Sequence, residues 1–172
     1  IEVSADGGQT WQPAGHGLES PMEDMVESFL AAPDGTIWFV GQRSNTIGQI
    51  NPASGEIREW LLPANALPHS VNVDAEGGVW YLGNGNGTIG RFDPSSGRST
   101  EYRMPNSAAR DPHTAEFDRN GIMWFSLQQS NMIGRFDPRS GEIRLASVST
   151  PRARPARAPR APRRECPSRR AR

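Results

Sequence analysis

A phrase of about 42 residues occurs three times in this chain, and it constrains the fold more than any other feature. Each copy has a glycine, a tryptophan three residues later, an Ile-Gly pair nine residues after the tryptophan, and then an Asx-Pro-x-Ser-Gly turn. The tryptophans are Trp38, Trp80 and Trp124, and the turns begin at Asn51, Asp93 and Asp137. The register advances by 42 and then by 44 residues, so the chain is a repeat protein.

Each repeat has the pattern of four short β-strands. In the second repeat we expect strands near residues 70–74, 79–83, 88–92 and 99–104, because apolar and polar residues alternate there between turn residues. In the Asx-Pro-x-Ser-Gly turn, proline fixes φ near about −65° and glycine accepts a positive φ. A four-stranded repeat of this length with one tryptophan is typical of a propeller blade. The sequence therefore predicts an all-β fold, a partial β-propeller of about three four-stranded antiparallel blades.

We expect these blades at about residues 21–62, 63–105 and 106–150, with the tryptophans buried where neighbouring blades stack. Closed propellers use about four to eight blades, so three blades leave sheet faces open. The remaining blades of a longer parent chain, or association, would have to cover them. The chain begins at Ile1 with no visible signal peptide, which also favours a fragment.

The two ends of the chain differ from the repeats. Residues 1–20 include Ser4–Trp11, which fits an Asp-box hairpin and is typical of the end of a preceding blade or domain. Residues 151–172 carry a net charge of +8, against −8 for residues 1–150, and include the single cysteine, Cys166. This Arg/Pro-rich tail lacks apolar residues to pack, so we expect disorder.

Two origins of the tail stay open. One is a basic arm that binds nucleic acid or an anionic membrane, although the aromatic residues that stack on bases are missing. The other, which we favour because the repeat stops in the middle of its motif, is an out-of-frame translation. Elsewhere, no apolar run approaches the roughly 20 residues of a membrane span. We therefore favour no nucleic-acid partner for this chain, and we expect no membrane span in it.

Two histidines are the first candidates for chemistry. His69 and His113 each follow a proline and precede the repeat tryptophan by 11 residues, so they are equivalent positions of adjacent blades. The first strand of a blade lines the propeller channel, and both rings are therefore expected at one mouth of the axis. There they could act in acid–base catalysis or bind a metal, or each could simply bond a neighbouring carbonyl. Asp111 could orient the His113 ring, and Glu27 takes the equivalent position in the first blade.

The residues from Pro112 to Gly141 resemble the repeat of the streptogramin B lyases, the virginiamycin B lyase family. The shared succession is Pro-His, Gly-x-x-Trp-Phe, Asn-x-Ile-Gly-Arg and Asp-Pro-x-Ser-Gly, and the resemblance covers about residues 22–155. It implies a seven-bladed propeller, of which this chain is roughly three blades, and a small-molecule or peptide ligand at the channel mouth.

The resemblance also implies an activity, the magnesium-dependent elimination that opens cyclic depsipeptide antibiotics. A base removes the proton α to a carbonyl of a threonine whose side-chain oxygen is acylated, Mg²⁺ polarises that carbonyl, and the carboxylate leaves without addition of water. By motif, His113 matches a catalytic or metal-proximal histidine, His69 matches its counterpart one blade earlier, and Asp111 matches an acidic neighbour.

One departure from the family pattern concerns the metal. The family has a glutamate 14 residues after the histidine, and this glutamate helps to hold the metal. Here these positions are Gly41, Gly83 and Leu127, none of which offers the side-chain oxygen that Mg²⁺ requires. These three blades therefore lack a key ligand.

Three hypotheses follow, and whether the protein is an enzyme stays open. The first is a fragment of a streptogramin lyase-like propeller, a carbon–oxygen lyase whose three blades alone would be inactive. The second is a non-catalytic propeller module that binds a ligand or protein at the channel mouth, and the third is a sugar-lactone hydrolase-like propeller with axial calcium. They predict dependence on magnesium, on no metal and on calcium, respectively. We favour a periplasmic or secreted location over a cytoplasmic one.

Overall fold

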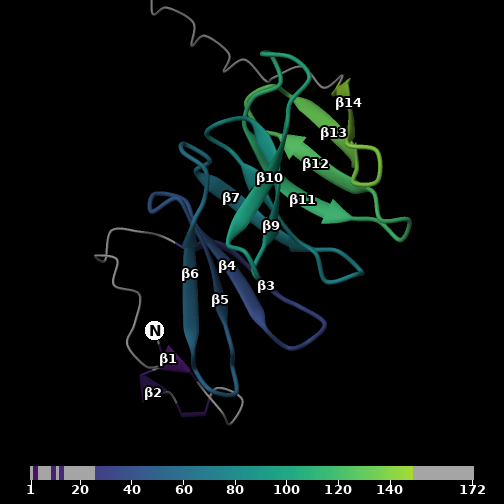
Figure 1. The fold of residues 1–172 in the computed structure, drawn as a ribbon. Helices are drawn as coiled ribbons and strands as arrows, with labels where there is room; N and C mark the ends of the chain where they lie inside the picture. Colours follow the sequence, from purple (N-terminus) through teal and green to yellow (C-terminus); the bar gives the residue numbers. More distant parts are fainter. Residues whose placement is uncertain (1, 4–8, 11, 14–25, 149–172) are drawn as a thin grey trace, which may run out of the picture.

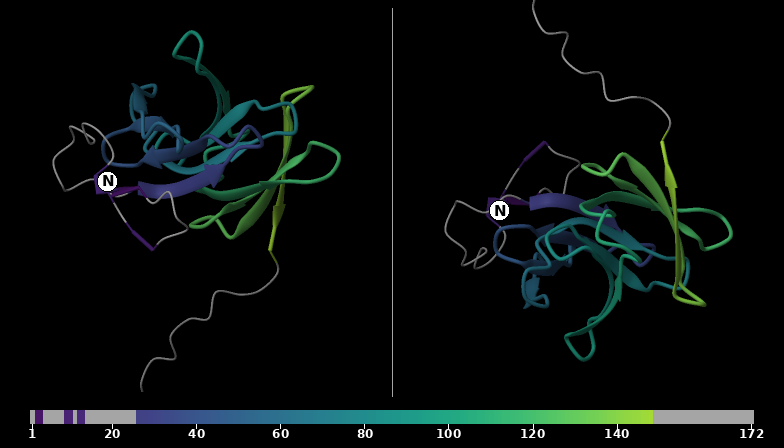
Figure 2. Two further views of the ribbon diagram at one scale, coloured as in Figure 1. Left: turned by 90° about the horizontal axis from the view of Figure 1, so that it is seen from below. Right: turned by 90° about the horizontal axis from the view of Figure 1, so that it is seen from above.

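The four strands of each repeat pair in sequence order as one antiparallel sheet. In the computed structural model, which describes residues 2–3, 9–10, 12–13 and 26–148, three such sheets lie side by side (Figure 1; Figure 2). The predicted all-β partial propeller of three four-stranded blades is confirmed. The described residues contain no helix, and so none that could cross a membrane.

Blade 1 contains β3 (Val26–Ala31), β4 (Ile37–Gly41), β5 (Thr46–Ile50) and β6 (Ile57–Leu61). Blade 2 contains β7 (Pro68–Val73), β8 (Val79–Gly83), β9 (Thr88–Asp93) and β10 (Arg98–Arg103). Blade 3 contains β11 (Pro112–Phe117), β12 (Met123–Leu127), β13 (Met132–Asp137) and β14 (Glu142–Ser147). A further pair, β1 (Glu2–Val3) and β2 (Gln12–Pro13), forms a two-stranded sheet. Most of the Asp-box at Ser4–Trp11 and the whole tail at 151–172 lie outside the described residues.

The strands of the second repeat begin and end within two residues of the expected ranges, because the turns between them are specified locally. In the turn after β9, Asp93 accepts hydrogen bonds from the backbone N–H of Ser95 at 2.9 Å and from the hydroxyls of Ser95 and Ser96. Gly97 then adopts a φ of 68°, which favours glycine. Asn51 and Asp137 likewise accept a hydrogen bond from the backbone N–H two residues later. The same type of turn therefore joins the third and fourth strands of all three blades.

Each blade has two different faces. The tryptophan face carries the repeat tryptophan and the isoleucine of the Ile-Gly pair, and the opposite face, here called the glycine face, carries the glycine of that pair. In every blade an aromatic ring of the second strand lies over the paired glycine, as Tyr81 lies over Gly90. A Cβ at that glycine would overlap the ring, which is why the repeat has glycine there.

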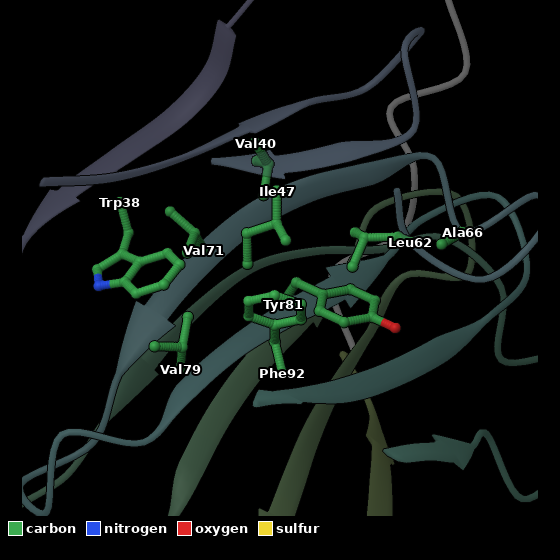
Figure 3. Close-up of a cluster of buried hydrophobic side chains, with 9 residues drawn as sticks. All are labelled: Trp38, Val40, Ile47, Leu62, Ala66, Val71, Val79, Tyr81 and Phe92. Atoms are coloured by element: carbon green, nitrogen blue, oxygen red, sulfur yellow. The ribbon is translucent and has the colours of Figure 1, made fainter. Parts of the chain in front are cut away.

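The blades stack with the tryptophan face of one against the glycine face of the next. Between blades 1 and 2, Trp38 and Ile47 pack against Val71, Tyr81 and Phe92 (Figure 3). Between blades 2 and 3, Trp80 packs against Phe117 and Phe136 with ring centroids 6.1 and 5.5 Å apart. A buried tryptophan removes roughly 150–250 Å² from water, a gross stabilisation of about 4–6 kcal/mol per blade. Contacts also join the first strands, β3 to β7 and β7 to β11, so these strands form the inner edge of the arc.

Candidate functional site

The candidate site forms where the first strand of each blade departs from regular pairing. A register shift falls between Val26 and Ser28, between Pro68 and Ser70, and between Pro112 and Ala115. Such β-bulges insert one residue, re-aim side chains, and are common next to active sites. The bulged segments carry Glu27, His69 and His113.

The bulges bring these three side chains into contact along the inner edge. Glu27 Oε2 lies 3.7 Å from His69 Nε2, and the His69 and His113 rings have centroids 3.6 Å apart with 33° between their planes. About a fifth of the Glu27 and His69 side chains is exposed, so both can be reached from solvent. One residue from each blade thus contributes to a single polar cluster, here called the axial cluster (Glu27, His69 and His113).

The surroundings of His113 favour the neutral form of its ring. Partial burial, followed by the positive charge that His69 can carry, lowers the pKa of His113, while the carboxylates of Asp111 and Glu27 oppose that effect. His113 Nδ1 lies 3.0 Å from the Thr114 hydroxyl. In the tautomer whose Nδ1–H donates to Thr114, Nε2 keeps a lone pair and can accept a proton.

Asp111 lies at the entry to β11 in a strained and buried position. Its φ is 70°, which is uncommon for a residue with a side chain, and only 8% of its surface is exposed. Asp111 Oδ1 accepts a hydrogen bond from Asn84, whereas Oδ2 has no partner among the described residues. The described contacts of Asp111 therefore fix the backbone ahead of His113, and they include no hydrogen bond to the His113 ring. A role for Asp111 in orienting that ring stays a prediction.

The sequence did not indicate a series of hydrogen-bonded side chains beside the axial cluster, here called the amide chain (Gln42 and Asn84). Gln42 Nε2 donates to Asn84 Oδ1 at 3.5 Å, and Asn84 Nδ2 in turn donates to Asp111 and, at 3.4 Å, to the Pro112 carbonyl. These hydrogen bonds link blades 1, 2 and 3. The one sequence signal of the amide chain is position, since Gln42 and Asn84 directly follow Gly41 and Gly83 at the ends of β4 and β8.

A pocket of about 610 Å³ adjoins this amide chain on the boundary of blades 2 and 3. Asn84 and Asp111 line it, together with Arg103 at the end of β10 and Arg110 on the connection from β10 to β11. Its lining combines amides, a carboxylate and guanidinium groups, which suits a polar ligand with both donors and acceptors.

The described residues do not fit the magnesium that the family resemblance implies. Gly41 and Gly83 have no side chain, Leu127 is buried, and a Cβ at Gly83 would overlap the side chains of Asn86 and Thr88. The nearby Glu101 is already engaged, because it accepts hydrogen bonds from the Tyr81 hydroxyl at 3.1 Å and from Asn86 and Thr88. The described part of the chain holds no group of three His, Cys, Asp or Glu that could bind a metal.

The fold and the axial cluster define a class, an open β-propeller with paired histidines at the inner edge of neighbouring blades. Residues 14–162 match the model of the virginiamycin B lyase family. The chain belongs to that family. No curated protein sequence matches it.

Solved structures agree with this family. A catalytically inactive histidine-to-alanine variant of virginiamycin B lyase from Staphylococcus aureus, determined with quinupristin, has 32% sequence identity and a TM-score of 0.70 over 80% of this chain and 45% of its own. A streptogramin B lyase structure has 29% identity and a TM-score of 0.71 over 84% of this chain and 46% of its own. This chain therefore spans less than half the length of these lyases.

A putative 6-phosphogluconolactonase from Bacteroides uniformis shares 14% identity with a TM-score of 0.57, over 83% of this chain and 48% of its own. At that identity the likeness shows the fold alone.

Proposed function

We propose that this chain supplies the axial part of a streptogramin lyase-like site, in which a cyclic depsipeptide binds over the axial cluster and His113 acts as the base of an elimination. The observation that carries the proposal is the contact between two histidine rings from equivalent bulges of adjacent blades. The inactive variant among the family structures, in which alanine replaces a histidine, supports a chemical role for histidine in this fold.

The elimination can be written with the residues of this chain. His113 Nε2 takes the proton from the α carbon of a threonine whose side-chain oxygen is acylated. The electron pair left by that proton forms the Cα=Cβ double bond, the Cβ–O bond breaks, and the carboxylate leaves. No water is added, so the opened peptide has the mass of the cyclic one. The lowered pKa of His113 keeps its ring neutral and able to accept the proton near neutral pH.

The proposal assigns magnesium to residues beyond the three blades. When bound, the metal would stabilise the negative charge that develops on the threonine carbonyl. Because Gly41, Gly83 and Leu127 offer no oxygen ligand, we expect the metal ligands on further blades of a longer protein. The 172-residue chain by itself is then expected to bind the peptide with little or no turnover.

The absence of side-chain oxygens at Gly41, Gly83 and Leu127 favours a second candidate. In it, the propeller is a non-catalytic module that binds a peptide at the channel mouth. The amide chain of Gln42 and Asn84 suits that role, since amides can donate to and accept from peptide groups.

Quinupristin with and without Mg²⁺ separates the two candidates, in the 172-residue chain and in the longest protein that contains it. Mass spectrometry and chromatography would follow the peptide, with His113→Ala as the test variant and Arg58→Ala, on the exposed edge of blade 1, as the control. Magnesium-dependent opening without mass change, lost in His113→Ala and kept in Arg58→Ala, supports the lyase. Binding without opening in the longer protein supports the module. A product heavier by one water, or no binding by either protein, would contradict both.

A further inference from the structure

The connection from blade 2 to blade 3 differs from the connection from blade 1 to blade 2. Residues 62–67 join blades 1 and 2, whereas residues 104–111 join blades 2 and 3, so the second connection is two residues longer. The shorter connection has no charged residue, and its Leu62 and Ala66 are buried. The longer one carries Arg110 and Asp111, which both line the pocket of about 610 Å³ described above. The boundary of blades 2 and 3 thus departs from the repeat at identifiable positions.

One of these positions opens the pocket. Between blades 1 and 2, the Asn45 side chain spans the space between the β4–β5 turn and the connection. Its Nδ2 donates to the carbonyls of Leu62 and Pro63, both at 3.0 Å. Its Oδ1 accepts a hydrogen bond from the Leu67 N–H at 2.7 Å. At the equivalent place between blades 2 and 3 the chain has Gly87, which lines the pocket and has no side chain to fill it.

The backbone of this turn does not require a glycine. Gly87 has a φ of 68°, and Asn45 and Asn131 adopt 59° and 51° at the same position of the other two blades. Asparagine is among the residues that tolerate this left-handed conformation. A Cβ at Gly87 would also meet nothing within 4 Å. The glycine therefore provides space for a ligand without being needed for the turn.

The charges that line the pocket favour an anion. Arg103 and Arg110 are exposed, and neither forms an ion pair among the described residues. Some arginines elsewhere on the blades do form ion pairs with a carboxylate, namely Arg58, Arg135, Arg139 and Arg144. The one carboxylate that lines the pocket, that of Asp111, accepts a hydrogen bond from Asn84. Two guanidinium groups outweigh one carboxylate, and a guanidinium matches the geometry of a ligand carboxylate.

The pocket lies next to the axial cluster. Asp111, which lines the pocket, precedes His113 by two residues, and its carboxylate is close enough to raise the pKa of that histidine. Asn84, which also lines the pocket, donates to the carbonyl of Pro112 directly ahead of His113. A group that is released beside His113 therefore has the pocket as a neighbour. The elimination described above releases such a group, a carboxylate that stays attached to the opened peptide.

We propose that this pocket, here called the carboxylate pocket (Gly87, Arg103 and Arg110), binds the carboxylate that the elimination releases and so holds the opened peptide. The identity of this ligand rests on the proposed function, whereas the preference for a carboxylate rests on the three pocket residues alone. All three belong to blades 2 and 3, so the pocket needs no residue from further blades. Binding forms and breaks no covalent bond.

The test compares two synthetic linear peptides by titration calorimetry on the 172-residue chain. One is the opened peptide acid that the elimination would make from quinupristin, and the other carries a carboxamide in place of its carboxylate. We expect the acid to bind about tenfold more tightly, because hydrogen bonds between charged groups are the stronger ones. Arg103→Gln and Arg110→Gln should each remove most of this preference and leave binding of the carboxamide unchanged. Arg98→Gln, on exposed β10 outside the pocket, is the matched control.

A substitution at Gly87 tests the space independently of the charge. Gly87→Asn would introduce the side chain that Asn45 has between blades 1 and 2, and the fold should tolerate it because Asn45 and Asn131 share the backbone conformation. We expect weaker binding of the acid, since the amide occupies the pocket, with unchanged circular dichroism. Gly121→Asn is the matched control, because Gly121 is a left-handed glycine with open space around its Cβ position and lies outside the pocket.

The outcomes separate this proposal from the elimination. Equal binding of acid and carboxamide, a preference for the acid that all three pocket variants keep, or no binding of either peptide would overturn the carboxylate pocket. Quinupristin opening by the longest protein that contains this chain is measured in parallel. Opening together with equal binding would overturn the pocket and leave the elimination intact. A preference for the acid without opening would support the pocket and contradict the elimination.

Discussion

Blades 2 and 3 share one sequence phrase but differ in what surrounds it. Trp80 and Trp124 both donate their indole N–H to an aspartate six residues earlier, at 2.8 and 3.0 Å, so the local structure is the same. Yet Trp80 is 2% exposed and Trp124 is 45% exposed, since only Trp80 is covered by a following blade. The comparison shows that the repeat specifies the blade, while the neighbour supplies much of the burial that stabilises it.

The largest effect on stability is expected at the two repeat tryptophans, whose exposure differs most. Trp80→Ala should lower the free energy of unfolding by about 3–5 kcal/mol, because it removes a fully enclosed indole. Trp124→Ala should lower it by at most about half as much, because half of that ring already faces water. Urea unfolding followed by circular dichroism checks both variants. Equal losses of stability in the two variants would mean that burial between blades does not distinguish Trp80 from Trp124.

A smaller and equal effect is expected where the two blades agree. In both, the glycine of the Ile-Gly pair lies under an aromatic ring of its own sheet, Tyr81 over Gly90 and Phe125 over Gly134. Gly90→Ala and Gly134→Ala should each destabilise by about 1–3 kcal/mol through overpacking. Adding Phe125→Leu to Gly134→Ala should recover part of the loss. A loss of stability in Gly90→Ala but not in Gly134→Ala would contradict the packing of an aromatic ring over this glycine within each sheet.

The smallest of the stability effects concerns acid. The Ser96 and Ser95 hydroxyls, together with the Ser95 backbone N–H, lower the pKa of Asp93 from 3.8 to about 2. A carboxyl with a lowered pKa in the folded state stabilises the fold above pH 3.8, and that contribution is lost as the pH falls towards about 2. Asp93→Asn should therefore flatten the pH dependence of stability in this window. An unchanged acid profile would show that the turn bonds add nothing to stability.

The sequence was sufficient for the parts of the fold that are specified locally. Asx-Pro-x-Ser-Gly turns and the spacing from each tryptophan placed the strands of blade 2 within two residues, because those turns depend on side-chain bonds to their own backbone. The proximity of His69 and His113 also followed from their equivalent positions.

Other parts of the site could not be predicted from sequence. A β-bulge has no residue signature of its own, so the inserted positions at Glu27 and His69 became visible only in the strand register. The hydrogen bond from Gln42 to Asn84 joins residues 42 apart, and the left-handed backbone of Asp111 depends on contacts from blade 2. These features arise where blades meet, and no single repeat encodes them.

The central claim is that His69 and His113 share one site at the inner edge of the blades. A pH titration of the His113 ring by NMR, in the wild type and in the His69→Gln and Glu27→Gln variants, tests it directly. We expect the pKa of His113 to lie below its ordinary 6.5, to rise in His69→Gln, which removes a positive charge, and to fall further in Glu27→Gln, which removes a negative one. A His113 titration that neither variant changes would contradict the account.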